Sequence, residues 1–579
     1  MEWRKIVLYV ISAVFGALLV FSWQKEHRQH PQTVSNSNQA GLAVNNEYVP
    51  QSKESSNNPS PQTVLTDSTN QPSLPSNLNN SNSNSLIRVK TDVLDVSIDP
   101  KGGNLVDARL LKYPVDVNDP NVPTQILNSD PSQLYLSQSG IITPNKSEVI
   151  SYQSKQPNYF LSQEGNNLDV VLTGKSENGL DVTKTYTFER GKYAIDLNYQ
   201  VTNNASKATP VNFYQQITRG GFPVKSSLHG RSYTGPSISS HETPFEKIPF
   251  KKLSSVNISR DVIGGWLAMQ QQYFLSAWVP NQSQTNHFYS NVFIPSNSRS
   301  YTDNIYTIGY LSPSQVVNPG KNINYHSVFY VGPELPDHLK LLAPNLDRTI
   351  DYGWLWFISE FIFWLMKQIH HVVGNWGWSI VLVTLLARAS LYWFAAKGFR
   401  SMAKMREVQP RIQALKERFG EDRQALSKAT MEFYRKEKIN PMGGCLPMII
   451  QIPVFFALYY VLIESVQLRQ APFILWVKDL SVHDPYYVLP ILMGLSMLLQ
   501  QKISPPLPDQ TQAKMMMLLP LVFTVFFLSF PAGLVLYWLT NNLANVAQQW
   551  YIMRTYNPKE VRDKERQKEK KKQKKKIKL

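Results

Sequence analysis

Hydrophobic and polar positions divide the chain into segments with contrasting patterns. A basic start, MEWRK, precedes an apolar run at 6–21, and 35 of the 55 residues at 31–85 are Asn, Ser, Pro or Gln. Such a polar stretch cannot bury enough apolar surface to offset the entropy lost on ordering. The pattern predicts a transmembrane signal anchor over 1–23 and a disordered linker over 24–85. A cleaved signal peptide is the alternative for the anchor, but the apolar run ends in Phe21-Ser22-Trp23 without a small-x-small cleavage site.

The pattern changes to a period of two between residues 86 and 350. Val89, Thr91 and Val93 alternate with polar neighbours, and the turn sequence Glu177-Asn178-Gly179 separates two further alternating runs. Short alternating runs with turn residues between them are typical of antiparallel sheets that bury one face. A large β-sandwich domain is therefore expected over 86–350.

After residue 350 the pattern becomes typical of a membrane protein. Residues 351–375 mix aromatic residues with Lys367 and two histidines, which predicts an amphipathic helix lying in the membrane interface. Apolar runs close to the roughly 20 residues that cross a bilayer follow; they lie near 376–396, 446–466, 486–503, 515–530 and 533–553. The fold class expected is a multi-domain membrane protein with six transmembrane α-helices, five of them forming a core over 376–553.

Charge is concentrated in two short segments. The formal net charge is +17, yet residues 24–350 carry 26 basic and 25 acidic residues. Residues 397–441 carry 12 basic and 6 acidic residues, and 559–579 carry 12 basic and 4 acidic residues. Lysine and arginine beside apolar helices favour the cytoplasmic side. Both termini and a basic tail over 554–579 are therefore expected in the cytoplasm, with the β domain in the periplasm.

The tail has no periodicity, and two partners fit its lysines. Lysine clusters next to a spanning helix attract anionic lipids. They also bind RNA phosphates without reading sequence, so contact with the ribosome is the second interpretation.

Residues 397–441 predict two helices joined at Gly420. Apolar residues on both sides of this glycine recur at helical spacing, which favours an antiparallel hairpin. An inert loop folded on itself and a docking arm for substrate or ribosome are both compatible with this pattern. The candidate arm residues are Met405, Ile412, Leu415, Phe419 and Phe433.

Arg388 is the most informative single residue. It lies in the apolar stretch 379–394, where a charge at a helix centre costs roughly 2.5–3.5 kcal/mol. No other predicted span carries an Asp or Glu near its middle, so a water-filled cavity is expected around the guanidinium. Snorkelling of the side chain to the cytoplasmic surface is the alternative. Further polar residues inside the spans, singly explained as contacts between helices, together suggest a polar surface; they include Thr384, Gln451, Ser496, Thr524, Asn541 and Asn542.

Signals for catalysis are weak. Cys445 is the single cysteine, which excludes an intramolecular disulfide framework and a multi-cysteine metal site. The seven histidines between residues 24 and 350 have no HExxH-type spacing, and no GxSxG or phosphate-binding loop occurs. No enzyme activity, metal or cofactor is expected.

Several motifs carry a resemblance to a known family. They are DYGWLWFIS (351–359), VGNWGWSI (373–380), SMAKMREVQPRIQALKERFG (401–420), NPMGGCLPMIIQIPVFFALYY (440–460), LRQAPFILWVKDLSVHDPYYVLPILMG (468–494) and FPAGLVLYW (530–538). Over about 350–553 the chain resembles the YidC membrane protein insertases, in the Gram-negative form with a large periplasmic domain.

The resemblance implies insertion and folding of newly made inner-membrane proteins, alone or with the Sec translocon, and without ATP. It implies a polar groove in which Arg388 matches the groove arginine and Thr384 a groove-side position. Trp538 matches an aromatic contact with the substrate, although some members have tyrosine there. The substrate-binding groove expected is Arg388, Thr384, Gln451, Trp538 and Asn541.

One departure concerns the end of the second transmembrane helix. Members of the family often carry proline five residues after the groove arginine, and this chain has Trp393. Two rival functions remain. A secondary transporter would show inverted repeats and paired acids within the membrane, and a periplasmic carbohydrate enzyme would show a His/Glu cluster and need only one anchor.

Overall fold

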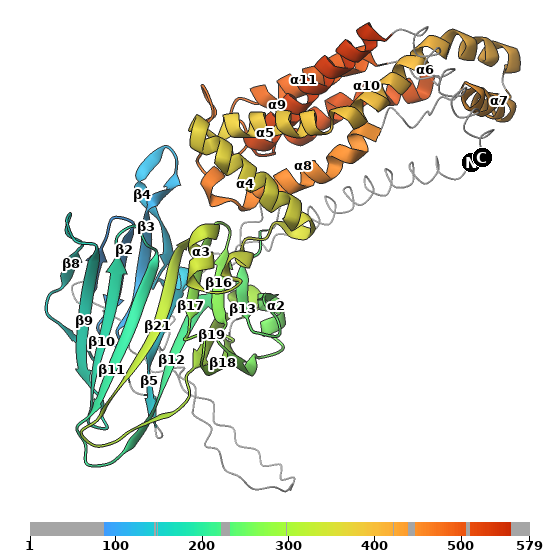
Figure 1. Ribbon diagram of the computed structural model, residues 1–579. Helices are drawn as coiled ribbons and strands as arrows, with labels where there is room; N and C mark the ends of the chain where they lie inside the picture. Colours follow the sequence, from blue (N-terminus) through green and yellow to red (C-terminus); the bar gives the residue numbers. More distant parts are fainter. Residues whose placement is uncertain are drawn as a thin grey trace, which may run out of the picture. The chain divides into compact units, whose positions relative to one another are not determined.

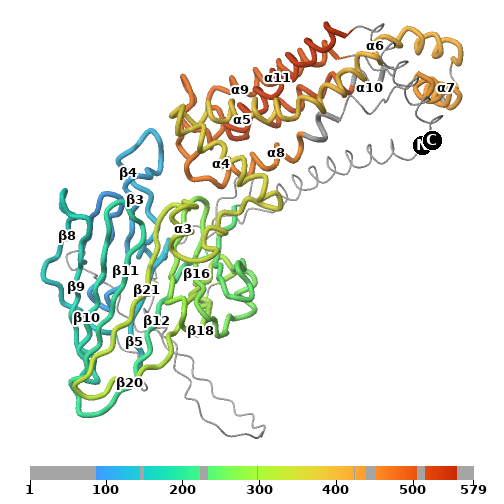
Figure 2. Tube along the Cα trace, viewed as in Figure 1, coloured from blue at the N-terminus to red at the C-terminus, as the bar shows by residue number. Residues whose placement is uncertain are grey.

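The computed structural model describes residues 86–143, 146–147, 149–221, 232–296, 298–420, 422–437, 446–504 and 510–556. The predicted anchor, the linker and residues 557–579 of the basic tail lie outside these ranges. A β-rich region is followed by a region of helices (Figures 1 and 2).

The described residues of the β region form two sheets. Nine strands of the first, twelve-stranded sheet follow one another in the order β15 (Ser259–Ile263), β18 (Thr285–Phe293), β19 (Ile305–Leu311), β12 (Thr209–Gly220), β5 (Tyr135–Thr143), β3 (Asn104–Asp116), β2 (Leu94–Asp99), β1 (Ile87–Lys90) and β8 (Asn158–Phe160). Its other strands are β20 (Gln315–Val317), β4 (Asp119–Leu127) and β6 (Lys146–Ser147).

The second sheet has nine strands and also mixes distant parts of the sequence. Their order is β14 (Glu246–Lys247), β13 (Gly235–Ser239), β16 (Trp266–Gln271), β17 (Phe274–Val279), β21 (Asn322–Pro333), β11 (Ala194–Asn203), β10 (Leu180–Glu189), β9 (Asn167–Lys175) and β7 (Gln153–Ser154).

The hairpin β9–β10 shows how alternation produces these strands. Alternate residues of β10 are buried along its whole length, as a period of two requires for a strand with one covered face. Leu168 pairs with Phe188 and Lys175 with Asp181. Gly179 has φ of +78°, a backbone conformation that glycine adopts without steric cost. The antiparallel pairing predicted around this turn is present.

The two sheets pack against each other through a shared core. The ring of Phe213 in β12 stacks on Tyr325 in β21, with centroids 4.4 Å apart. Lys184 in β10 is fully buried, and its Nζ donates to the main-chain oxygens of Gly103 at 2.7 Å and Ser139 at 3.1 Å. Burial lowers the pKa of the Lys184 ammonium well below its usual value. Sequence alternation places a lysine on the inner face here but does not reveal its carbonyl partners.

One short helix, α2 (Phe250–Leu253), lies within the β region, and the other described helices follow it. These are α3 (Pro336–Leu342), α4 (Trp356–Val373), α5 (Trp376–Ser390), α6 (Tyr392–Phe419), α7 (Arg423–Lys436), α8 (Leu446–Glu464), α9 (Val488–Ile503), α10 (Gln510–Phe527) and α11 (Ala532–Thr555). Taken singly, no helix among the described residues has both the length and the apolar composition to cross a membrane; α5 and α6 together meet that criterion, with a bend of 67° between them.

This bend corrects the expected end of the second span. The sequence predicts a continuous helix over 376–396, whereas α5 ends at Ser390 and Leu391 alone separates it from α6. Ser390 Oγ donates to the oxygen of Leu386 at 3.0 Å, a back-bond within the helix that is associated with bending. The chain therefore turns here although Trp393, and not the expected proline, follows the break. As a consequence, the helix predicted to start the cytoplasmic hairpin at 397 begins at Tyr392.

The hairpin of α6 and α7 turns at Gly420, as the sequence predicts. Gly420 has φ of +53°. The Asp422 side chain then accepts from the amides of Gln424 and Ala425, which satisfies two of the unpaired amides at the start of α7.

Candidate functional site

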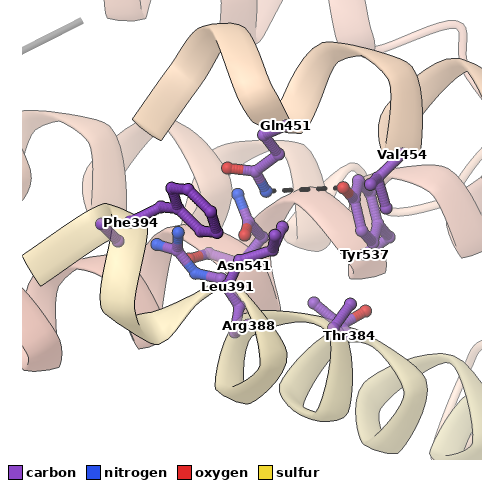
Figure 3. A pocket seen from close by; sticks show the side chains of 10 residues that line it. Thr384, Arg388, Leu391, Phe394, Gln451, Val454, Tyr537 and Asn541 are labelled. Atoms are coloured by element: carbon purple, nitrogen blue, oxygen red, sulfur yellow. Dashed lines mark hydrogen bonds between the residues drawn. The ribbon is translucent and has the colours of Figure 1, made fainter. Parts of the chain in front are cut away.

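A pocket lies among α5, α6, α8 and α11, with about 390 Å³ of space free of protein atoms, open solvent included (Figure 3). Its walls combine polar and apolar side chains from both sides of the helix break. The lining residues are Thr384, Ala387, Arg388, Leu391, Phe394, Ala395, Gln451, Val454, Tyr537 and Asn541.

Among the described residues of this lining, Arg388 is the only one with a charged side chain. Its Nη2 lies 3.5 Å from the main-chain oxygen of Asn541, a long hydrogen bond. Its Nε is buried and has no hydrogen-bond partner within the described ranges, and no carboxylate there pairs with it. A guanidinium has five N–H donors in a planar fork that suits carboxylates. The pocket therefore presents a buried Nε–H donor without an acceptor among the described residues, an arrangement suited to a transient anionic or polar guest.

The other polar groups leave further hydrogen-bonding capacity in the pocket. Gln451 Nε2 donates to the hydroxyl of Tyr537 at 3.4 Å, which links α8 to α11. Thr384 Oγ1 donates to the oxygen of Ile380 at 2.6 Å within its own helix. The Asn541 Oδ1 atom is buried without a partner in the part of the chain that the structure describes. Four predicted groove residues, Arg388, Thr384, Gln451 and Asn541, thus share one pocket.

Trp538, the fifth predicted groove residue, does not line this pocket. Its ring packs against Phe455 in α8 and Phe527 in α10, with centroids 5.0 Å and 5.3 Å apart. Tyr537 occupies the pocket instead, because residues four apart share a helix face and Tyr537 lies four residues before Asn541. That spacing could have identified Tyr537 from the sequence. Leu391, Phe394 and Val454 carry no comparable signal, since apolar residues are expected throughout these helices.

Other polar residues within the helices form hydrogen bonds away from the pocket. Asn542 Nδ2 donates to Ser496 Oγ at 3.3 Å, between α11 and α9. Thr524 Oγ1 donates to the oxygen of Pro520 in its own helix. The Asn542–Ser496 bond corresponds to the interpretation as a contact between helices, whereas the Thr524 bond stays within α10.

The candidate arm residues divide into two groups. Met405, Ile412 and Phe433 pack with Val408 and Tyr434 in a small apolar cluster between α6 and α7. Leu415 and Phe419 lie outside this cluster and are half-buried.

A Ser–His–Asp contact occurs on the β domain and bears on the enzyme alternative. His287 Nδ1 lies 2.8 Å from Asp261 Oδ1, and its Nε2 lies 3.3 Å from Ser259 Oγ. The Asp261 side chain is 72% exposed, whereas the aspartate of a working triad is buried. The three residues therefore form a surface hydrogen-bond cluster, which gives no support to hydrolysis. Sequence reasoning missed it because β15 and β18 meet only through their pairing.

Comparisons with known proteins cover nearly the whole chain. The family model described as "60Kd inner membrane protein" matches residues 368–560, and the one described as "YidC periplasmic domain" matches residues 86–365. The Membrane protein insertase YidC of Coxiella burnetii (strain RSA 331 / Henzerling II) is 50% identical over 576 residues, covering 98% of this chain and 99% of the relative.

A second relative and a solved structure are also similar to this chain. The Membrane protein insertase YidC of Legionella pneumophila (strain Paris) is 44% identical over 573 residues, covering 97% of this chain and 99% of the relative. A crystal structure of an active YidC insertase with the first transmembrane domain resolved covers 82% of this chain and 93% of its own, at 18% identity and a TM-score of 0.39. On the strength of the sequence matches, the chain belongs to the YidC family of membrane protein insertases.

Proposed function

We propose that this chain inserts and folds newly made proteins in the bacterial inner membrane, and that the pocket around Arg388 receives their polar leading segments. Membership of the insertase family supports the general activity. The single observation that supports the role of the pocket is the buried Arg388 Nε without a partner among the described residues, beside polar groups of four other side chains.

The proposed mechanism uses charge and hydrophobic partitioning. An acidic or polar tail binds the Arg388 donors by charge-assisted hydrogen bonds, so it crosses part of the apolar layer without losing all its polar partners. The apolar segment that follows then gains free energy by moving into lipid. In this mechanism partitioning and the membrane potential drive insertion, and ATP is not required.

The topology and partners in this proposal follow from the charge distribution. Six spans place both termini and the α6–α7 hairpin in the cytoplasm, with residues 86–350 in the periplasm. The hairpin and the basic tail face the ribosome, and the tail also contacts anionic lipids. Cooperation with the Sec translocon rests on the family alone.

Site-specific photocrosslinking tests the proposal. A photoreactive amino acid is placed at Thr384 or Gln451 in the pocket, or as a control at Leu495, which lies on α9 and is 56% exposed. Ribosome-bound nascent chains of a single-span membrane protein serve as substrate. Crosslinks from both pocket positions and none from Leu495 are expected.

Absence of crosslinks from both pocket positions, with folded protein and bound ribosomes, would contradict the proposal. Solute uptake into vesicles containing the protein would then be measured, since a secondary transporter is the alternative that uses the same pocket.

A further inference from the structure

The Arg388 pocket is built across the break between α5 and α6. Thr384, Ala387 and Arg388 line it from α5, and Phe394 and Ala395 line it from α6. Leu391, the one residue between the helices, has φ of −90° and ψ of 4°. Rotation of α6 about this residue would therefore move one wall of the pocket relative to the other.

A small contact holds α6 against α11 next to the pocket. Ala395, Ala396 and Phe399 pack with Ile552 in a buried cluster, which we call the α6–α11 seam. The nearest polar support is the Gln548 Nε2 bond to the Tyr392 oxygen, which is long at 3.4 Å. The seam contains only four buried residues, and two of them are alanines, so it buries much less apolar surface than the large core that joins the other helices.

Polar atoms near the seam lack partners while it is closed. Arg388 Nε, Asn541 Oδ1 and Asn545 Oδ1 are all buried without hydrogen bonds in the described residues. Buried polar groups without partners destabilise the arrangement that contains them. A polar polypeptide segment between α6 and α11 would supply both donors and acceptors, and opening of the seam would then be partly offset by new hydrogen bonds.

The helix α6 also connects the seam to the hairpin. It extends from Tyr392 to Phe419, a length of roughly 42 Å at 1.5 Å per residue, and contains Pro410. The Val408, Ile412 and Tyr434 cluster and the Arg411–Glu437 ion pair fix α7 to it. A displacement of the hairpin would therefore act on the helix break through α6, in which Pro410 lacks a main-chain N–H donor.

We propose that Phe394 is the gate of the Arg388 pocket and that α6 opens it by pivoting at Leu391 away from Ile552. The Phe394 ring points into the pocket beside the Arg388 guanidinium, although half of the residue is exposed (Figure 3). With the seam open, this ring leaves the pocket and a polar substrate segment reaches Arg388. The identity of that occupant rests on the proposed function, whereas the gate itself is a property of the free protein.

Thiol labelling of the full-length protein in detergent tests the gate without any substrate. Cys445 is first replaced by serine, and Thr384→Cys is then introduced as the single thiol. The rate at which this thiol reacts with a small charged methanethiosulfonate is measured. Adding Phe394→Ala is expected to raise the rate several-fold. Trp393→Ala is the matched control, because Trp393 is an aromatic neighbour that is 66% exposed and does not line the pocket. Adding it should leave the labelling rate of the Thr384→Cys thiol unchanged. Equal rates in all three proteins would overturn the gate.

A reversible lock tests the seam. Ala395→Cys with Ile552→Cys, oxidised to a disulfide in the Cys445→Ser background, is expected to abolish most insertion and to slow labelling at Thr384→Cys by a bulky probe. Reduction should restore both. The control is Ser496→Cys with Asn542→Cys, which ties α11 to α9 on another face and should leave insertion and labelling unchanged.

Full insertion by the completely locked seam protein would refute the pivot. If instead the reduced protein does not insert substrates at all, the proposed function fails while the labelling rates still decide whether Phe394 is a gate.

Discussion

Arg388 Nη2 reaches the main-chain oxygen of Asn541 at 3.5 Å and, within the described ranges, forms no ion pair with a carboxylate. A main-chain oxygen is a weaker partner for a guanidinium than a carboxylate is. This relationship leaves the arginine available to a guest, and it sets the first prediction.

Arg388→Gln should lower insertion of substrates with acidic tails by about tenfold to a hundredfold. The expected loss is one hydrogen bond to a charged group, roughly 1.5–3 kcal/mol. Arg388→Lys keeps the charge but not the planar fork, so an intermediate rate is expected. The measurement is protease protection of a single-span substrate in proteoliposomes. A substrate with a neutral tail serves as control, and its insertion should fall much less. Equal losses of insertion for both tails would contradict a role of Arg388 in binding charge.

The buried Lys184 is expected to make the free energy of unfolding of the β domain depend on pH. Burial lowers its pKa in the folded state, so the unfolded state binds more protons and stability should rise with pH. The slope is at most about 1.4 kcal/mol per pH unit for one proton. Urea unfolding followed by fluorescence of the buried Trp266 and Trp278 between pH 7 and 9.5 measures it.

Lys184→Met is the matched variant for that experiment. It should lack this rise with pH, and it should be less stable at pH 9 by about 1–3 kcal/mol because the Gly103 and Ser139 oxygens lose their donor. Identical pH profiles for the two proteins would show that the lysine does not titrate in this range.

Glu334 is expected to make the stability of the protein depend on pH in the opposite direction. It is 3% exposed, and burial raises its pKa well above the usual value. The folded state then binds more protons than the unfolded state above about pH 4.5, so stability falls as pH rises. Glu334→Gln should therefore be more stable than the natural chain at pH 8, with the difference shrinking toward pH 4.5. The exposed Glu242→Gln is the control in thermal unfolding, and a constant difference at all pH values would count against the explanation.

The Asp484 carboxylate is expected to stabilise the segment before α9. Its fully buried carboxylate accepts from Trp476 Nε1 at 3.0 Å, from the Tyr486 amide at 3.0 Å and from the Leu489 amide at 2.8 Å. Asp484→Ala leaves these donors without an acceptor and should lower stability by about 3–5 kcal/mol. Asp484→Asn retains one acceptor oxygen and should lose less. Thermal unfolding in detergent compares the three proteins. The unfolding temperature should be lowest for Asp484→Ala, intermediate for Asp484→Asn and highest for the natural chain.

The sequence by itself determined the local elements. Period-two alternation located the β9–β10 hairpin, since side chains of a strand alternate between two faces. Helical spacing and Gly420 located the turn between α6 and α7, and Arg388 could be identified because a charge is rare in an apolar run. The shared motifs then identified the family, and the sequence comparisons confirmed it.

Only the tertiary structure decided which side chains meet. Asn541 and Asn542 are neighbours in sequence, yet one faces the Arg388 pocket and the other binds Ser496, because successive residues of a helix point about 100° apart. The same rotation places Tyr537 in the pocket and Trp538 among the aromatic rings. The Ser390 back-bond accompanies the bend at Leu391 locally, whereas the contacts of α6 with α11 beyond the bend join residues far apart in the chain. Sequence thus fixes the type of each element, whereas the orientation of its faces depends on the packing of segments far apart in the chain.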